Sequence, residues 1–230
     1  MQKTFFLYWP EKRSDYPMFR RRILKEITPQ FQQIEHARRL KVTLTGSAPP
    51  LLSLVPFQRK KLALFSLWSD TATDPAPYLE ILAGAGNKTA AYRVTETTPV
   101  AYTRTWPLGS VSPGVGMLTL LNGNPKLSRE AFMAEWFGRH TPMSIEIHPL
   151  WNYIRNVVET PLNADAPHFD GIVEEHFRSR SDLLNPLCLF GGPLHAFFNM
   201  VRVGLHINKF MDLKTMQNYL VEEVHITDDR

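Results

Sequence analysis

The first half of the chain combines short apolar runs with one long helical pattern. Four apolar runs predict strands, at residues 4–9, 40–44, 62–68 and 90–95. Residues 16–35 carry large apolar side chains at spacings of three and four, which predicts an amphipathic helix. Pro29 lies inside this pattern and predicts a kink or an early end of the helix. A short helix is expected after Asp74, so the predicted order is β-α-β-β-α-β.

The second half repeats this order. Apolar runs again predict four strands, at residues 117–121, 151–158, 171–178 and 218–226. Ser128 is expected to cap a helix, and Pro142 is expected to end it. One stripe of this helix is formed by Phe132, Trp136 and His140. A second helix, interrupted by a proline and two glycines, is expected within residues 182–204.

Two such units in tandem predict an α+β protein made of two ferredoxin-like modules. Each module would leave one face of its antiparallel sheet uncovered, and packing the two faces together would bury both. We therefore expect an intrachain α/β barrel. The expected boundaries are a degenerate first module at residues 1–97, a linker at 98–115 and a second module at 116–230.

Composition narrows the class of protein. With 230 residues, 43% of them hydrophobic, the chain can bury one large core or two smaller ones. Cys188 is the only cysteine, which excludes an internal disulfide framework and favours a reducing compartment. The apolar run at 5–9 is too short for a signal peptide, and no run approaches the roughly 20 residues of a membrane helix. We expect a cytoplasmic protein without a membrane partner.

The net charge is +4, and basic residues cluster in the first half, at residues 12–13, 20–22 and 59–61. One interpretation of such clusters is a surface for nucleic acid or anionic lipid, and the other is a solvated face. Because no recognised nucleic-acid motif accompanies the charge, we expect no nucleic-acid partner.

The second half also carries a set of motif residues: Arg139-His140-Thr141-Pro142, His148-Pro149, Tyr153, Asn156, Asp170-Gly171-Ile172, Glu174, Phe177 and Glu222-Glu223-Val224-His225. With them, the segment 116–226 resembles the EthD-like family of dimeric α/β-barrel proteins, whereas the first half matches in element order alone. The resemblance implies a ferredoxin-like fold whose sheets pair into a barrel, ordinarily between two chains. Here the tandem would supply both sheets, and a homodimer of the whole chain is a further expectation.

His140 is the first candidate for catalysis. An imidazole titrates near neutral pH, so it can accept and donate a proton within one cycle. The family resemblance adds to this prediction. The alternative is that a ring nitrogen of His140 satisfies a carbonyl at the end of the helix.

Glu174 and His176 share one face of a predicted strand, since alternate residues point the same way. Either would assist His140 as an ion-pair partner or as a base, and a solvated polar patch is the alternative. Glu175 points the opposite way, and if it faces helices its carboxylate needs a partner, because an unpaired buried charge is costly. Glu175 and His176 both depart from the family, which commonly has an apolar residue and an aromatic there.

Tyr153 and Asn156 are candidates for stabilising a developing oxygen anion, although they lie on opposite faces of an ideal strand. Three aromatic side chains are candidates for contacting an aromatic substrate: Trp136, Trp151 and Phe177. Packing in the core is the alternative for all these aromatics.

No cofactor and no metal is expected. The sequence has no phosphate-cradling glycine loop, no Rossmann fingerprint and no short metal-ligand spacing. His140, Glu174 and His176 would form a set of two histidines and one carboxylate for a metal only if their side chains converge.

These residues lead to a hypothesis on function. We expect a cofactor-independent lyase or isomerase that moves a proton in a small apolar molecule, aromatic or polyketide-like, with cyclase- or dehydratase-like chemistry. One alternative is a non-catalytic protein that binds a hydrophobic ligand or acts as an accessory. The other is a cofactor-free monooxygenase, as found among similar barrels.

Overall fold

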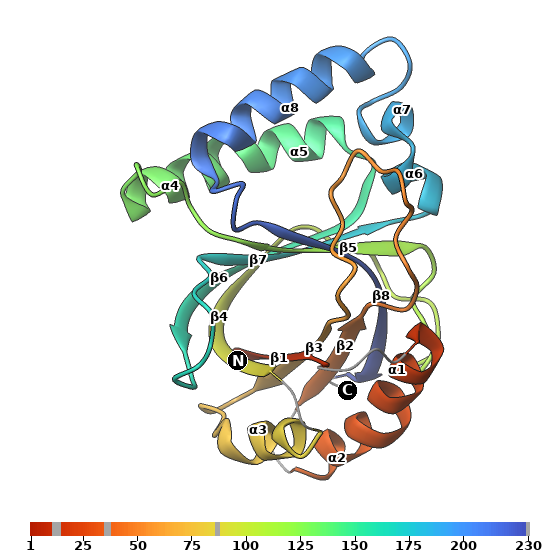
Figure 1. The fold of residues 1–230 in the computed structure, drawn as a ribbon, viewed down its shortest axis with the longest axis vertical. Helices are drawn as coiled ribbons and strands as arrows, with labels where there is room; N and C mark the ends of the chain where they lie inside the picture. Colours follow the sequence, from red (N-terminus) through yellow and green to blue (C-terminus); the bar gives the residue numbers. More distant parts are fainter. Residues whose placement is uncertain (11–14, 35–37, 86–87, 229–230) are drawn as a thin grey trace.

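The computed structural model describes residues 1–10, 15–34, 38–85 and 88–228, so the basic pair at 12–13 lies outside the described part. Figure 1 shows a central barrel of strands with helices on two opposite sides. The first module contributes strands β1 (Gln2–Trp9), β2 (Arg39–Leu44), β3 (Ala63–Ser69) and β4 (Lys88–Val100). Its helical segments are α1 (Tyr16–Arg22), the π-helical turn η1 (Ile23–Ile27), α2 (Thr28–Gln33) and α3 (Ala76–Ala83).

The second module has the same order of elements. Its strands are β5 (Val115–Leu121), β6 (Leu150–Pro161), β7 (Gly171–Phe177) and β8 (Gln217–Thr227). Its helical segments are α4 (Arg129–Glu135), η2 (Trp136–His140), α5 (Thr141–Ile147), α6 (Arg180–Leu184), α7 (Pro186–Leu189) and α8 (Ala196–Phe210). The tandem β-α-β-β-α-β architecture predicted from the sequence is confirmed.

The eight strands close into one antiparallel barrel, in the order β1-β3-β2-β8-β5-β7-β6-β4. The two modules meet along two seams, β2 against β8 and β4 against β6. At these seams the edge strands of one sheet pair with the edge strands of the other, which removes the exposed edges that each sheet would have alone. The expected intrachain α/β barrel is therefore confirmed.

Apolar side chains fill the barrel and the spaces beneath the helices. Phe5, Leu118 and Ile172 belong to the cluster inside the barrel. In the first module, Phe31 of α2 packs against strand residues, Phe65 among them. Among the described residues, none of the helices combines the length and the apolar character that crossing a lipid bilayer requires.

The main helix of each module continues through a proline. The expected end at Pro142 is wrong, because α5 follows η2 without interruption. A proline ring clashes with the carbonyl four residues before it, and the wider π-helical turn that precedes Pro142 relieves this clash. The Thr141 hydroxyl donates to the Trp136 carbonyl at 2.9 Å, and Thr28 donates to the Ile23 carbonyl at 2.8 Å in the first module. The same arrangement at the same position of both modules supports their origin by duplication.

Candidate active site

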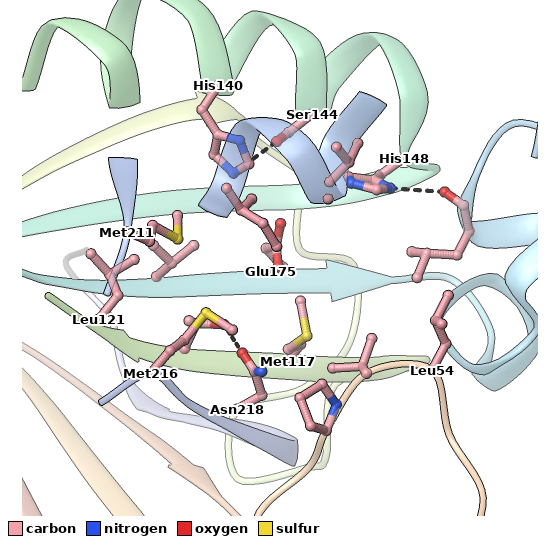
Figure 2. Close-up of a pocket in the computed structure, with 18 of the residues that line it drawn as sticks. Leu54, Met117, Leu121, His140, Ser144, His148, Glu175, Met211, Met216 and Asn218 are labelled. Atoms are coloured by element: carbon pink, nitrogen blue, oxygen red, sulfur yellow. Dashed lines mark hydrogen bonds between the residues drawn. The ribbon is translucent and has the colours of Figure 1, made fainter. Parts of the chain in front are cut away.

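An apolar cavity of about 290 Å³ lies between the sheet and the helices of the second module (Figure 2). Strands β5, β6 and β7 line one side, helices η2, α5 and α8 line the other, and residues 54–56 of the first module reach it as well. The volume is near the lower end of the range typical of small-molecule sites. Most of the wall is apolar, and the polar side chains in it are Thr119, His140, Ser144, His148, Tyr153, Glu175 and Asn218.

Local backbone geometry explains why these groups meet. Alternation along β7 turns Val173, Glu175 and Phe177 toward the helices. His140 of η2 and Ser144 of α5 are four residues apart, which places them on one side of the helix, and His148 follows directly after α5 ends and lines the same cavity.

Glu175 is the most unusual group in the cavity. Within the described residues its carboxyl makes no hydrogen bond or ion pair, and Figure 2 shows it between the helix that carries His140 and the strand that carries Met117. Burial raises the pKa of Glu175 to about 7. The carboxyl therefore exchanges its proton close to neutral pH, and the acidic and basic forms are both populated there.

His140 has a different state. Its Nε2 lies 3.4 Å from the Ser144 hydroxyl, its Nδ1 has no hydrogen-bond partner among the described residues, and its ring stacks on that of His206. Burial, assisted by the charges of His206 and His148, lowers the pKa of His140 to about 3. His140 is therefore neutral at physiological pH, where it can take part in hydrogen bonds but does not carry a charge.

Three other predicted residues lie in the same cavity. Tyr153 is buried, and burial together with the charge of Glu175 raises the pKa of Tyr153 to about 12, so its hydroxyl remains protonated. Trp136 and Phe177 form part of the wall. Trp151 does not line the cavity, and its ring packs on Tyr102 and Trp106 at one end of the barrel instead.

Glu174, His176 and Asn156 face the barrel interior, on the other side of the sheet from His140. Glu174 forms ion pairs with Lys3 at 3.1 Å and with Lys41 at 2.7 Å. His176 Nε2 donates to the Pro113 carbonyl at 2.7 Å. The prediction that Glu174 or His176 assists His140 is therefore wrong, and the three side chains cannot share a metal ion. The physical reason is the alternation of β7, which sends neighbouring residues to opposite faces.

Asn156 and Tyr153 likewise point to opposite faces of β6. The Asn156 amide accepts a hydrogen bond from Lys3 at 2.8 Å and donates to the Ile172 carbonyl at 2.9 Å. Asn156 therefore belongs to the network inside the barrel and cannot stabilise an oxygen atom beside Tyr153.

The network inside the barrel consists of charges from both modules. Burial alone would raise the pKa of Glu174, but the charges of Lys3 and Lys41 lower it to about 2. Lys41 also contacts Glu223 of β8 at 3.4 Å, and Tyr102 and His225 approach the same carboxylate. Glu174 is therefore a permanently charged, fully partnered group and not a base that works near neutrality.

The equivalent space in the first module is filled. The residue before the Thr-Pro pair is Ile27 there, where the second module has His140. Aromatic rings occupy the space between helices and sheet: Phe31 stacks on Phe65 with 4.2 Å between ring centroids, and the tilted ring of Tyr78 lies 5.0 Å from that of Phe31. Among the described residues, the polar side chains that line the cavity therefore all come from the second copy.

Comparisons with known proteins support the fold. No family model and no curated protein matches the sequence. A solved anthrone oxidase-like protein superposes with a TM-score of 0.58 at 9% identity, over 100% of this chain and 95% of that chain. A protein of Fusobacterium nucleatum with the provisional name monooxygenase gives a TM-score of 0.48 at 6% identity, over 98% and 92%. At such identity the first likeness shows the fold alone: a closed barrel of antiparallel strands flanked by helices, formed here within one chain.

Proposed function

We propose that the cavity of the second module removes a proton from a small, largely apolar aromatic molecule without a cofactor, with Glu175 as the base. The observation that carries this proposal is the carboxyl of Glu175, which lines an apolar cavity and has no hydrogen-bond or ion-pair partner within the described residues. A part-buried carboxyl that loses solvent without gaining a partner reduces stability, and such a cost is typical of functional sites.

The surrounding groups suit the product of proton abstraction. Removing a proton next to a carbonyl or from a phenol places negative charge on an oxygen atom, and hydrogen-bond donors aimed at that atom stabilise it. Tyr153 has a protonated hydroxyl, and His140 is a neutral imidazole with one N–H. These two groups are the proposed donors, whereas the apolar walls hold the rings of the substrate.

The resulting anion can follow one of two routes. Return of the proton at another carbon gives isomerisation, and loss of a leaving group gives a lyase reaction. Alternatively the anion reacts with dioxygen, and a CH₂ group becomes a carbonyl with release of one water per dioxygen. The anthrone oxidase-like neighbour makes anthrone a suitable first probe for the proton abstraction and for the reaction with dioxygen, because anthrone has an acidic CH₂ between aromatic rings.

Deuterium exchange isolates the proposed step from both routes. We expect the protein to accelerate exchange of the anthrone CH₂ in D₂O under nitrogen, followed by NMR. Glu175→Gln should lower this acceleration by about 10²–10⁴-fold. Glu146→Gln is the matched control, because Glu146 lies on the exposed side of α5 in an ion pair with Arg202. Dioxygen uptake after admission of air then separates the oxygenase from the isomerase.

A non-catalytic ligand-binding protein is the rival candidate, and the mostly apolar wall of the cavity favours it. Saturable binding of anthrone without exchange above the protein-free rate would support that rival and contradict the proposed base. Exchange that Glu175→Gln leaves unchanged would also contradict the assignment.

A further inference from the structure

A second opening lies at one end of the barrel, outside the cavity described above. It has a volume of about 910 Å³ and is formed where β1 ends and where β4 and β8 begin. The network of Lys3, Lys41 and Glu174 occupies the other half of the barrel, since Lys3 lies at the start of β1 and Trp9 at its end. We call this opening the basic mouth.

Positive charge is concentrated at the basic mouth. Its lining contains the side chains of Arg59, Lys60, Lys61, Lys88 and Lys214, and no aspartate or glutamate among the described residues. None of these five cations forms an ion pair within the described part of the chain, although Lys61 and Lys88 lie over the rings of Tyr16 and Trp9. The whole chain has a net charge of +4, so this one opening carries more positive charge than the protein does overall.

A solvated face does not explain this arrangement well. Ordinary surfaces mix the two signs of charge, because like charges that are close together repel each other. A concave site with charges of a single sign concentrates the electric field and attracts ions of the opposite sign. The basic cluster at residues 59–61 thus forms part of a concave, positively charged site.

The floor of the basic mouth is aromatic. Phe169 and Tyr219 are buried there and Trp9 is part-buried. The Trp9 indole N–H donates to the Tyr219 hydroxyl at 3.3 Å, which in turn donates to the Gln217 side chain at 2.7 Å. Flat rings of a ligand can stack on such a floor. The side-chain amides in the lining supply polar partners for ring edges, from Gln58, Asn122 and Gln217.

We propose that the basic mouth binds a nucleotide-like ligand, in which a phosphate group meets the lysines and a heterocyclic ring lies on the aromatic floor. Lysine binds phosphate as a compact point charge, and aromatic side chains stack on a nucleobase of any kind, because every base has a flat π-face. The cations surround one opening instead of following a groove across the surface, which favours a mononucleotide over a nucleic-acid strand. This proposal does not depend on the function of the Glu175 cavity, although Met216 lines both spaces.

Isothermal titration calorimetry of the full chain tests the proposal with three probes: ADP, pyrophosphate and adenosine. ADP should bind more tightly than either of the other two, and its affinity should fall as ionic strength rises. Lys61→Gln/Lys88→Gln should weaken ADP and pyrophosphate by at least about tenfold, the equivalent of about one charge-assisted hydrogen bond. Trp9→Leu should weaken ADP and adenosine and leave pyrophosphate unchanged.

The control variant Lys25→Gln/Lys209→Gln removes the same charge away from the basic mouth and should leave ADP binding unchanged. Thermal unfolding of each variant verifies that the fold is intact. The proposal is overturned if millimolar ADP and pyrophosphate give no saturable heat, or if the two double variants behave alike. A single-stranded oligonucleotide that binds far more tightly than ADP through Lys61 and Lys88 would also overturn it, in favour of a nucleic-acid site.

Discussion

Glu174 and Glu175 are neighbours in sequence, but their pKa values are shifted in opposite directions. Glu174 is held between two lysines inside the barrel, and their charges lower its pKa. Glu175 faces an apolar cavity and has no partner among the described residues, so burial raises its pKa. One residue of β7 therefore stabilises the barrel, and the next provides a titratable group near neutral pH.

The pH dependence of activity follows from the state of Glu175. Only the ionised carboxyl acts as a base, so the rate of proton exchange should rise with pH and level off above a midpoint near 7. His140 is neutral throughout this range and should add no second rise. Initial exchange rates from pH 5 to pH 9 measure the profile. A midpoint near the ordinary pKa of a glutamate would contradict a desolvated carboxyl without a partner.

Stability should change in the opposite direction from activity. The pKa of Glu175 is about 7 in the folded state, against an ordinary value of 4.5. The free energy of unfolding therefore falls as pH rises from 4.5 to 7, because the carboxyl ionises less readily in the folded protein than in the unfolded chain. Above pH 7 this loss of stability is complete. Glu175→Gln removes the penalty and should raise the free energy of unfolding at pH 8 by up to about 3 kcal/mol. Urea denaturation at pH 4 and pH 8 measures the difference, which should be small at pH 4. An equal effect at both values would show that the charge is not the cause.

At the scale of elements, the continuous helix from α4 to α5 determines where His140 lies. The π-helical turn η2 places His140 directly before the Thr141–Pro142 pair. The Thr141 hydroxyl donates to the Trp136 carbonyl and accepts a hydrogen bond from Arg155 at 2.8 Å. These bonds fasten the turn to β6 and thereby fix the position of the imidazole.

Matched substitutions in the two modules test this role. Thr141→Val and Thr28→Val each remove a buried hydroxyl, and each should lower the free energy of unfolding by about 1–3 kcal/mol. Thr141→Val should also slow proton exchange and Thr28→Val should not, because the cavity with Glu175 and His140 lies in the second module. Denaturation and exchange rates are measured on both variants. Equal exchange rates would mean that the turn does not position His140.

At the scale of the molecule, opposite charges join the modules across the barrel. The lysines of the network come from β1 and β2 of the first module, and Glu174 and Glu223 come from β7 and β8 of the second. In a pairing of the first module with its own copy, Lys41 would lack both of these carboxylates and Lys3 would keep Glu96 of its own module without Glu174. The network therefore favours the pairing of unlike modules that the barrel shows.

Removing Lys41 should destabilise the whole barrel. Lys41→Met leaves Glu174 and Glu223 without a shared cation, and breaking a buried pair in this way costs about 3–5 kcal/mol. Because its pKa is lowered, Glu174 adds stability that is complete above pH 4.5 and is lost as pH falls toward 2. In Lys41→Met this decrease of the free energy of unfolding at low pH should be smaller. Urea denaturation between pH 3 and pH 7 measures both effects. Full stability in the variant would show that the network contributes nothing.

Much of the architecture was predictable from the sequence, because it depends on neighbours along the chain. Periods of two and of three to four residues identified the strands and helices, and Ser128 does cap α4, accepting a hydrogen bond from Ala131. The same periods placed Trp136, His140 and Phe177 on faces that meet in the cavity. The continuation of the helix through Pro142 could not be inferred, since the π-helical turn that relieves the proline is itself a backbone adjustment.

The tertiary structure alone decided which face of each strand is enclosed by the barrel and which by the helices. Local alternation established that Glu174 and Glu175 point apart, but the partners of Glu174 lie far away in sequence, at Lys3 and Lys41. Charge state depends on burial and on the charges nearby, and both arise only when distant segments pack together. The sequence by itself determined the elements and their order, whereas the closed barrel determined which carboxyl is held in an ion pair and which one titrates.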